Sequence, residues 1–135
     1  MPTLDKFCSI EADLGMEVIG KTPAGTRVDF PFQGVATSPH WEGERPVKGV
    51  DYVTVRGDGN MTLDIHGVIG EGKEAVSYRG GGVSIANPDR SADPKELIVF
   101  ETGNEDLAWL NTEVAVGFGH GAGGRITIDV YLVRP

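Results

Sequence analysis

The sequence has a single cysteine, Cys8, and no long apolar run. A disulfide within the chain is therefore excluded, and no stretch is long enough to cross a bilayer as a helix. The opening residues, MPTLDKFCSIEADLG, carry acidic side chains where a secretory signal would need a basic end and an apolar segment. These features predict a soluble cytoplasmic protein.

Positive charge is also scarce, because 12 Lys and Arg residues stand against 20 Asp and Glu residues, for a net charge of -8. Binding to nucleic acid and to anionic membranes rests largely on Lys and Arg contacts. We therefore expect neither nucleic acid nor a membrane surface as a partner. The length of 135 residues and the 39% hydrophobic content predict one domain, residues 1–135, with a sizeable core.

No segment shows the apolar stripe of an amphipathic helix, whereas short alternating or β-branched runs recur between glycines. The 20 glycines are about double the usual frequency of roughly 7%. Strands are expected at residues 4–13, 27–37, 50–56, 61–69, 74–79, 96–102, 107–118 and 125–133. The connections are too short for crossover helices, which favours an all-β, antiparallel barrel or sandwich without a helix longer than about three turns.

The segment VDYVTVRGDGNMTLDIHGVI, residues 50–69, predicts a hairpin whose loop is Gly57–Gly59. This register gives the hairpin one apolar and one polar face. The apolar face holds Val53, Val55, Met61, Leu63 and Ile65, and the polar face holds Tyr52, Thr54, Arg56, Thr62, Asp64 and His66. The pattern alone leaves two interpretations open: the polar face is in water, or it lines the interior of a barrel.

Sequence motifs for cofactors and common catalytic machinery are absent. GHGAGG, residues 119–124, is followed by a strand pattern instead of a helix, so it predicts a hairpin loop and not a dinucleotide site. The three histidines lack the paired spacing of metal ligands. No Gly-x-Ser-x-Gly elbow occurs, and Cys8 is expected to be a buried, inert thiol. We expect no cofactor and no metal.

Several motifs in order resemble the family filed as domain of unknown function 3237. They are KTPAGTR at 21–27, KGVDY at 48–52 followed by RGDG, LDIHG at 63–67, and FETG, AWLN and IDVY in the last third of the chain. The resemblance implies a single antiparallel β-barrel with a central pocket, often found as a homo-oligomer, in a family whose members mostly lack assigned reactions.

The sequence departs from the family pattern at two positions of the polar hairpin face. Tyr52 stands where the family usually has Trp, and His66 stands where it commonly has Arg. The second change replaces a permanent cation with a group that can move protons near neutral pH. The loop ATSPHWEGERP also differs, which places His40 and Trp41 as candidates at the pocket mouth.

The resemblance also favours Glu101, Trp109 and Asn111 as pocket residues, with Tyr78 adding a phenol to the lining. In the alternative interpretation Glu101 caps a turn, Trp109 belongs to the core and Asn111 holds a loop.

The functional prediction is an acid–base group inside the barrel, formed by Asp64, His66 and Glu101. A small-molecule substrate would be held by Tyr52, Tyr78, Trp109, Asn111, His40 and Trp41. The corresponding activity is that of a cofactor-independent lyase, isomerase or hydratase acting on an apolar or aromatic metabolite. The alternative is a barrel that binds a small molecule without catalysis.

Self-association is predicted from the apolar hairpin face. If Val53, Val55, Leu63 and Ile65 point outward, they form an exposed patch of the kind that monomers avoid. A homo-oligomer would cover this patch.

Overall fold

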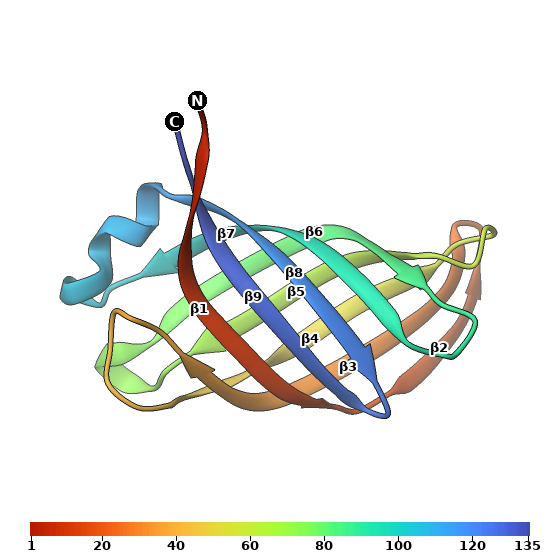
Figure 1. The fold of residues 1–135 in the computed structure, drawn as a ribbon. Helices are drawn as coiled ribbons and strands as arrows, with labels where there is room; N and C mark the ends of the chain where they lie inside the picture. The colour runs from red at the N-terminus through yellow and green to blue at the C-terminus, as the bar shows by residue number, and fades with distance from the viewer.

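The structure is a computed structural model that describes residues 1–135 and contains nine strands (Figure 1). They are β1 (Thr3–Leu14), β2 (Glu17–Thr22), β3 (Gly25–Thr37), β4 (Arg45–Val55), β5 (Met61–Ile69), β6 (Val76–Ala86), β7 (Ala92–Thr102), β8 (Val114–Ala122) and β9 (Arg125–Arg134). From β2 to β9 each strand pairs with the next, and β1 pairs with β9 and with β3. Eight strands, β1 and β3 to β9, thus close an antiparallel barrel. The short strand β2 pairs with the first part of β3. The predicted all-β barrel is confirmed.

The predicted hairpin register is also confirmed. Thr54 pairs with Thr62, and Val55 pairs with Met61. Gly59 has the positive φ, 86°, that the loop requires. At the other predicted hairpin, Gly123 and Gly124 have positive φ in the turn that joins β8 to β9.

The face of the β4–β5 hairpin that points inward is the apolar one. Val53 and Leu63 are only 2% and 6% exposed, whereas Tyr52 is 39% exposed on the outside. The prediction that the polar face lines the interior is therefore wrong. An eight-stranded barrel is just wide enough for side chains to fill, and burial of the apolar face is favourable.

The prediction that this apolar face is exposed and drives self-association is consequently wrong as well. Val53, Leu63 and Ile65 belong to the core, and Val55 packs against it. Exposed apolar side chains lie instead on the outer faces of β7 and β8, namely Leu97, Val99, Val114 and Phe118.

The expected strand over residues 107–118 begins only at Val114. Glu105–Thr112 forms a 3-10 helix, η2, which follows the cap residue Asn104 and buries Leu107 and Leu110. The side chain of Asn104 accepts a hydrogen bond from the backbone N–H of Asp106, which favours the helical turn over an extended chain. A second 3-10 turn, η1, spans Gly72–Glu74. No helix in the structure has the length and apolar character needed to span a membrane.

The two ends of the barrel differ. At the left in Figure 1, η2 and the β3–β4 loop cover one end. Phe7 fills this end, with its ring centre 5.4 Å from that of Phe100 and 6.2 Å from that of Trp109. A bulge between Lys6 and Cys8 in β1 interrupts the alternation, so that Phe7 and Cys8 are both buried. The opposite end consists of tight turns.

Two glycines opposite each other allow two aromatic rings to rest on the inner wall. Gly49 of β4 pairs with Gly67 of β5. A Cβ at Gly67 would overlap the ring of Tyr78, and a Cβ at Gly49 would lie 2.6 Å from the ring of Phe32. Because Gly49 and Gly67 have no side chains, the rings of Phe32 and Tyr78 can lie directly against the strand backbone.

Gly67→Ala should lower the free energy of unfolding by about 1–3 kcal/mol, because the Tyr78 ring must move. Gly57→Ala is the matched control, since no atom lies within 4 Å of a Cβ there, and its effect should stay below about 0.5 kcal/mol. Urea unfolding followed by tryptophan fluorescence measures both variants. Equal losses in the two variants would contradict the placement of Tyr78.

Candidate functional site

The barrel encloses a mainly apolar cavity that contains two acidic residues, Asp51 and Glu96. Of its 15 lining residues, 13 are hydrophobic. The cavity volume is about 50 Å³, which is enough for several water molecules. The lining consists of Cys8, Ile10, Ala12, Leu14, Phe32, Asp51, Ile65, Ile69, Tyr78, Glu96, Ile98, Phe100, Ile126, Ile128 and Val130.

Glycines on the neighbouring strands make room for the side chain of Glu96. Glu96 of β7 pairs with Gly82 of β6 on one side and with Gly117 of β8 on the other. A Cβ at Gly117 would already lie 3.4 Å from the Cβ of Glu96. A Cβ at Gly82 would lie 2.1 Å from the carbonyl oxygen of Lys95, so glycine at both positions allows the neighbouring strands to pack closely around Glu96.

Glu96 is the more deeply buried of the two acids, with 8% of its surface exposed. Its carboxyl group makes no hydrogen bond or ion pair within the protein and keeps some accessible surface, because Glu96 lines the cavity. Burial raises the pKa of Glu96 to about 8, and the negative charge of Asp51 contributes to the increase. A neutral, protonated Glu96 is therefore the favoured form at pH 7.

Asp51 lies on the inner face of β4, where a local gap in the strand pairing gives it a partner. The β4–β5 ladder has no pairs between Asp51–Ile65 and Thr54–Thr62. In this gap the backbone N–H of Asp64 donates a hydrogen bond of 3.1 Å to Oδ1 of Asp51. Burial raises the pKa of Asp51 to about 6, against the lowering effect of this hydrogen bond, and the charge of Asp64 raises it further.

Tyr78 is the third polar group of the cavity, and it is 5% exposed. Its ring lies against Gly67, and its hydroxyl makes no hydrogen bond to the protein. Burial raises the pKa of Tyr78 well above its usual value, and the charge of Glu96 adds to this effect. The phenol therefore keeps its proton at neutral pH.

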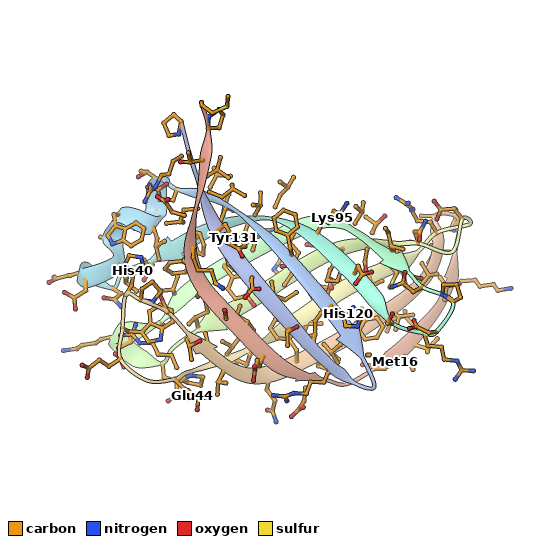
Figure 2. All side chains as sticks on the ribbon, in the orientation of Figure 1. Met16, His40, Glu44, Lys95, His120 and Tyr131 are labelled. Carbon is orange, nitrogen blue, oxygen red and sulfur yellow. The ribbon has the colours of Figure 1, made fainter.

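A second pocket lies towards the end of the barrel that η2 does not cover. Its volume is about 430 Å³, and it shares Leu14, Asp51 and Ile126 with the inner cavity. Met16 lines this pocket and lies at the opposite end of the barrel from His40 (Figure 2). Asp51 therefore borders both spaces.

The three residues predicted to be catalytic lie outside the barrel. Asp64 and His66 are neighbours on the outer face of β5, with Oδ1 and Nε2 separated by 3.1 Å. Glu101 is exposed on β7, and the adjacent Phe100 points inward instead. Their predicted placement inside the barrel is wrong because alternation puts the apolar side chains of both strands on the inner face. Tyr52 accompanies them outside, and its ring centre lies 5.6 Å from that of His66.

Three predicted binding residues lie at the closed end. The ring centres of His40 and Trp109 are 5.0 Å apart. The indole N–H of Trp41 donates to the backbone carbonyl of Ala36 at 3.3 Å. His40 and Trp41 therefore do not border the pocket mouth, because the β3–β4 loop that carries them closes the other end.

Asn111 does not line the inner cavity, and its side chain instead holds a loop, as the alternative interpretation expects. Its side chain accepts a hydrogen bond from the backbone N–H of Thr102 at 2.7 Å and donates one to the Thr102 carbonyl at 2.9 Å. This pair of bonds ties η2 to the end of β7. Among the predicted site residues, Tyr78 alone lines the inner cavity.

Sequence reasoning missed Asp51 and Glu96, although the alternation contains a signal for both. Asp51 lies on the same face of β4 as Val53. Glu96 lies on the same face of β7 as Ile98 and Phe100. A single acid on the apolar face of a strand points to the interior together with its apolar neighbours. No three His, Cys, Asp or Glu side chains converge as a metal-binding group.

Comparison with known proteins identifies the fold and the family. A β-barrel-like protein from Acinetobacter baumannii AYE is 19% identical, with a TM-score of 0.87 over 99% of this chain and 97% of that one. A protein of unknown function from Clostridium acetobutylicum ATCC 824 is 17% identical, with a TM-score of 0.86 over 99% and 100% of the two chains. An enzyme from Penicillium herquei is 18% identical, with a TM-score of 0.67 over 98% and 95%.

At these identities the likeness shows the fold alone, and no curated protein matches the sequence. The family model described as "Protein of unknown function (DUF3237)" matches residues 2–133. As its motifs predicted, the chain therefore belongs to the DUF3237 family.

Proposed function

We propose that the protein is a cofactor-independent acid–base enzyme that acts on a small molecule inside the barrel. The observation that carries this proposal is the buried carboxyl group of Glu96, which has no protein partner and shares a cavity with Asp51. Burial of an unpartnered polar group costs stability. Groups of this kind, with strongly shifted pKa values in a cleft, are typical of functional sites.

The two carboxyl groups suit opposite roles at neutral pH. With a pKa of about 8, Glu96 holds a proton and can act as a general acid. With a pKa of about 6, Asp51 is mostly ionised and can act as a general base. Two titratable groups with separated pKa values in one site are a recurrent arrangement in acid–base enzymes.

The reaction types that fit are those of lyases, isomerases and hydratases, because each moves protons without net oxidation. The 13 hydrophobic residues among the 15 that line the cavity favour an apolar or aromatic metabolite. The structurally similar Penicillium herquei protein is an enzyme, which supports the view that this fold can hold a catalytic site.

The alternative function is a barrel that binds a small molecule without transforming it. The apolar lining supports this alternative equally well, since Glu96 could donate a hydrogen bond to a bound ligand without transferring the proton. Formation of a product separates the two functions, because a binding protein leaves its ligand unchanged.

Self-association and a cytoplasmic location stay predictions. The apolar side chains on β7 and β8 support the first, because Val99 and Val114 are paired neighbours and both are half exposed. The acid–base roles of Asp64, His66 and Glu101 also stay predictions, now for residues on the outer face.

The free energy of unfolding should fall as the pH rises from about 4.5, the ordinary pKa of Glu96, to about 8, its pKa in the folded protein. In this window the folded chain holds a proton that the unfolded chain has released, so a rise in pH favours unfolding. The loss should amount to roughly 3–5 kcal/mol. Urea unfolding between pH 5 and pH 9 measures it.

Glu96→Gln should remove most of this pH dependence, because an amide does not titrate. Glu17→Gln is the control, since Glu17 is an exposed strand residue, and it should keep the wild-type profile. A profile in Glu96→Gln that is as steep as the wild-type profile would show that Glu96 is not the responsible group.

Turnover of a substrate found by screening metabolites for product formation should depend on both inner acids. Asp51→Asn and Glu96→Gln should each lower turnover by roughly a hundredfold or more, and Glu17→Gln should not change it. Circular dichroism checks that each variant is folded. If His66→Ala and Glu101→Gln abolish turnover and the two inner variants retain it, the reaction takes place on the outer face and the proposal is wrong.

A further inference from the structure

We infer that the interior site takes an uncharged carbonyl compound with a hydrogen on the carbon beside the carbonyl, and that the protein converts it to its enol. This inference rests on the proposed function and adds to it the substrate class and the reacting bond. It follows from which polar groups the cavity offers and which it lacks.

The cavity lacks any cation. Its polar side-chain groups are the carboxyls of Asp51 and Glu96 and the hydroxyl of Tyr78, and no Lys, Arg or His contributes to its lining. A carboxylate or phosphate ligand would lose its hydration and face acidic groups without an opposite charge. The inner cavity therefore disfavours anions, whereas the second pocket has one cation in its lining, Arg90.

The cavity offers two hydrogen-bond donors that have no partner in the protein. Protonated Glu96 has one O–H donor, and the phenol of Tyr78 has another. Glu96 and Tyr78 line the same cavity. A carbonyl oxygen is an uncharged acceptor with two lone pairs, so it can accept from both donors. An ammonium ligand has only donors, so it could pair with the Asp51 carboxylate but could not accept from Glu96 or Tyr78.

Asp51 is the group that can accept a proton from carbon. Its Oδ1 is held by the backbone N–H of Asp64 at 3.1 Å, which restrains the carboxylate where it borders both the inner cavity and the second pocket. Glu96 belongs to β7 and Asp51 to β4, which are not adjacent strands. The acid and the base therefore approach a ligand from different parts of the wall.

The enolisation balances without a further reactant. The Asp51 carboxylate takes the proton from the carbon beside the carbonyl, and the C–H electron pair forms a C=C bond. The π pair of the C=O bond moves to oxygen, which takes the proton of Glu96. Tyr78 donates a hydrogen bond to this oxygen as negative charge develops. Return of a proton from Asp51 to carbon and of the enol proton to Glu96 restores both groups.

Three probes with the same six-membered ring test the charge preference. They are cyclohexanone, cyclohexanecarboxylate and cyclohexylammonium, which are neutral, anionic and cationic. Saturation-transfer NMR with the full chain measures their binding. Cyclohexanone should bind more tightly than either ion, and Glu96→Gln should bind it as well as the wild type or more weakly by less than about tenfold, because an amide still donates a hydrogen bond.

Exchange of the α-hydrogens of cyclohexanone in D₂O tests the reaction directly. The wild-type protein should accelerate the loss of their NMR signal over buffer alone, and Asp51→Asn should lower this acceleration by roughly a hundredfold. Tyr78→Phe should lower it without reducing the binding of cyclohexanone by a similar factor. Glu17→Gln, the surface control, should exchange at the wild-type rate.

Each contrary result has a separate meaning. Tighter binding of either ion would overturn the inferred substrate class but leave the cavity as the binding site. Binding of cyclohexanone without faster exchange would overturn the enolisation but leave other acid–base reactions open to the proposed function. Failure of all three probes to bind would count against both.

Discussion

Closure of the barrel by the pairing of β1 with β3 is the constraint on which the interior depends. Ser9–Leu14 of β1 pairs with residues 32–37 of β3, and this contact joins the two edges of the sheet. In a closed barrel each strand has one inner and one outer face, so every second residue is enclosed whatever its chemistry. Glu96 is buried and Asp51 is half-buried for this reason, each on the otherwise apolar face of its strand.

The interior around these acids is not arranged for maximal packing. Gly82 and Gly117 flank Glu96 on the neighbouring strands, and glycine within a strand lowers its stability. The carboxyl group of Glu96 also has no protein partner and borders a small, mainly apolar cavity. Both features work against stability, and both leave a polar group accessible to a ligand. This combination is what a binding or catalytic site requires, and a purely structural barrel does not need it.

Local features of the chain could be predicted from the sequence, whereas the choice of inner face could not. The hairpin register follows from a glycine at a position of positive φ and from the alternation beside it, and the structure confirms it. The two faces of that hairpin have the same periodicity, so only closure of the barrel decides which one is enclosed. Residues 107–112 alternate like a strand, yet the cap at Asn104 and the burial of Leu107 and Leu110 favour a 3-10 helix. The bulge that buries both Phe7 and Cys8 breaks the alternation without a local signal.

The motifs that carry the family resemblance acquire a physical meaning once the inner face is known. KGVDY contributes Gly49 and Asp51 to the inner wall, and LDIHG contributes Gly67. The two glycines seat the rings of Phe32 and Tyr78, and the backbone of Asp64 holds the carboxylate of Asp51. The side chains of Asp64 and His66, which suggested acid–base chemistry, point away from this wall. The outer residue Asp64 thus takes part in the inner site through its backbone N–H, which fills a gap in the β4–β5 ladder and orients the base at the same time.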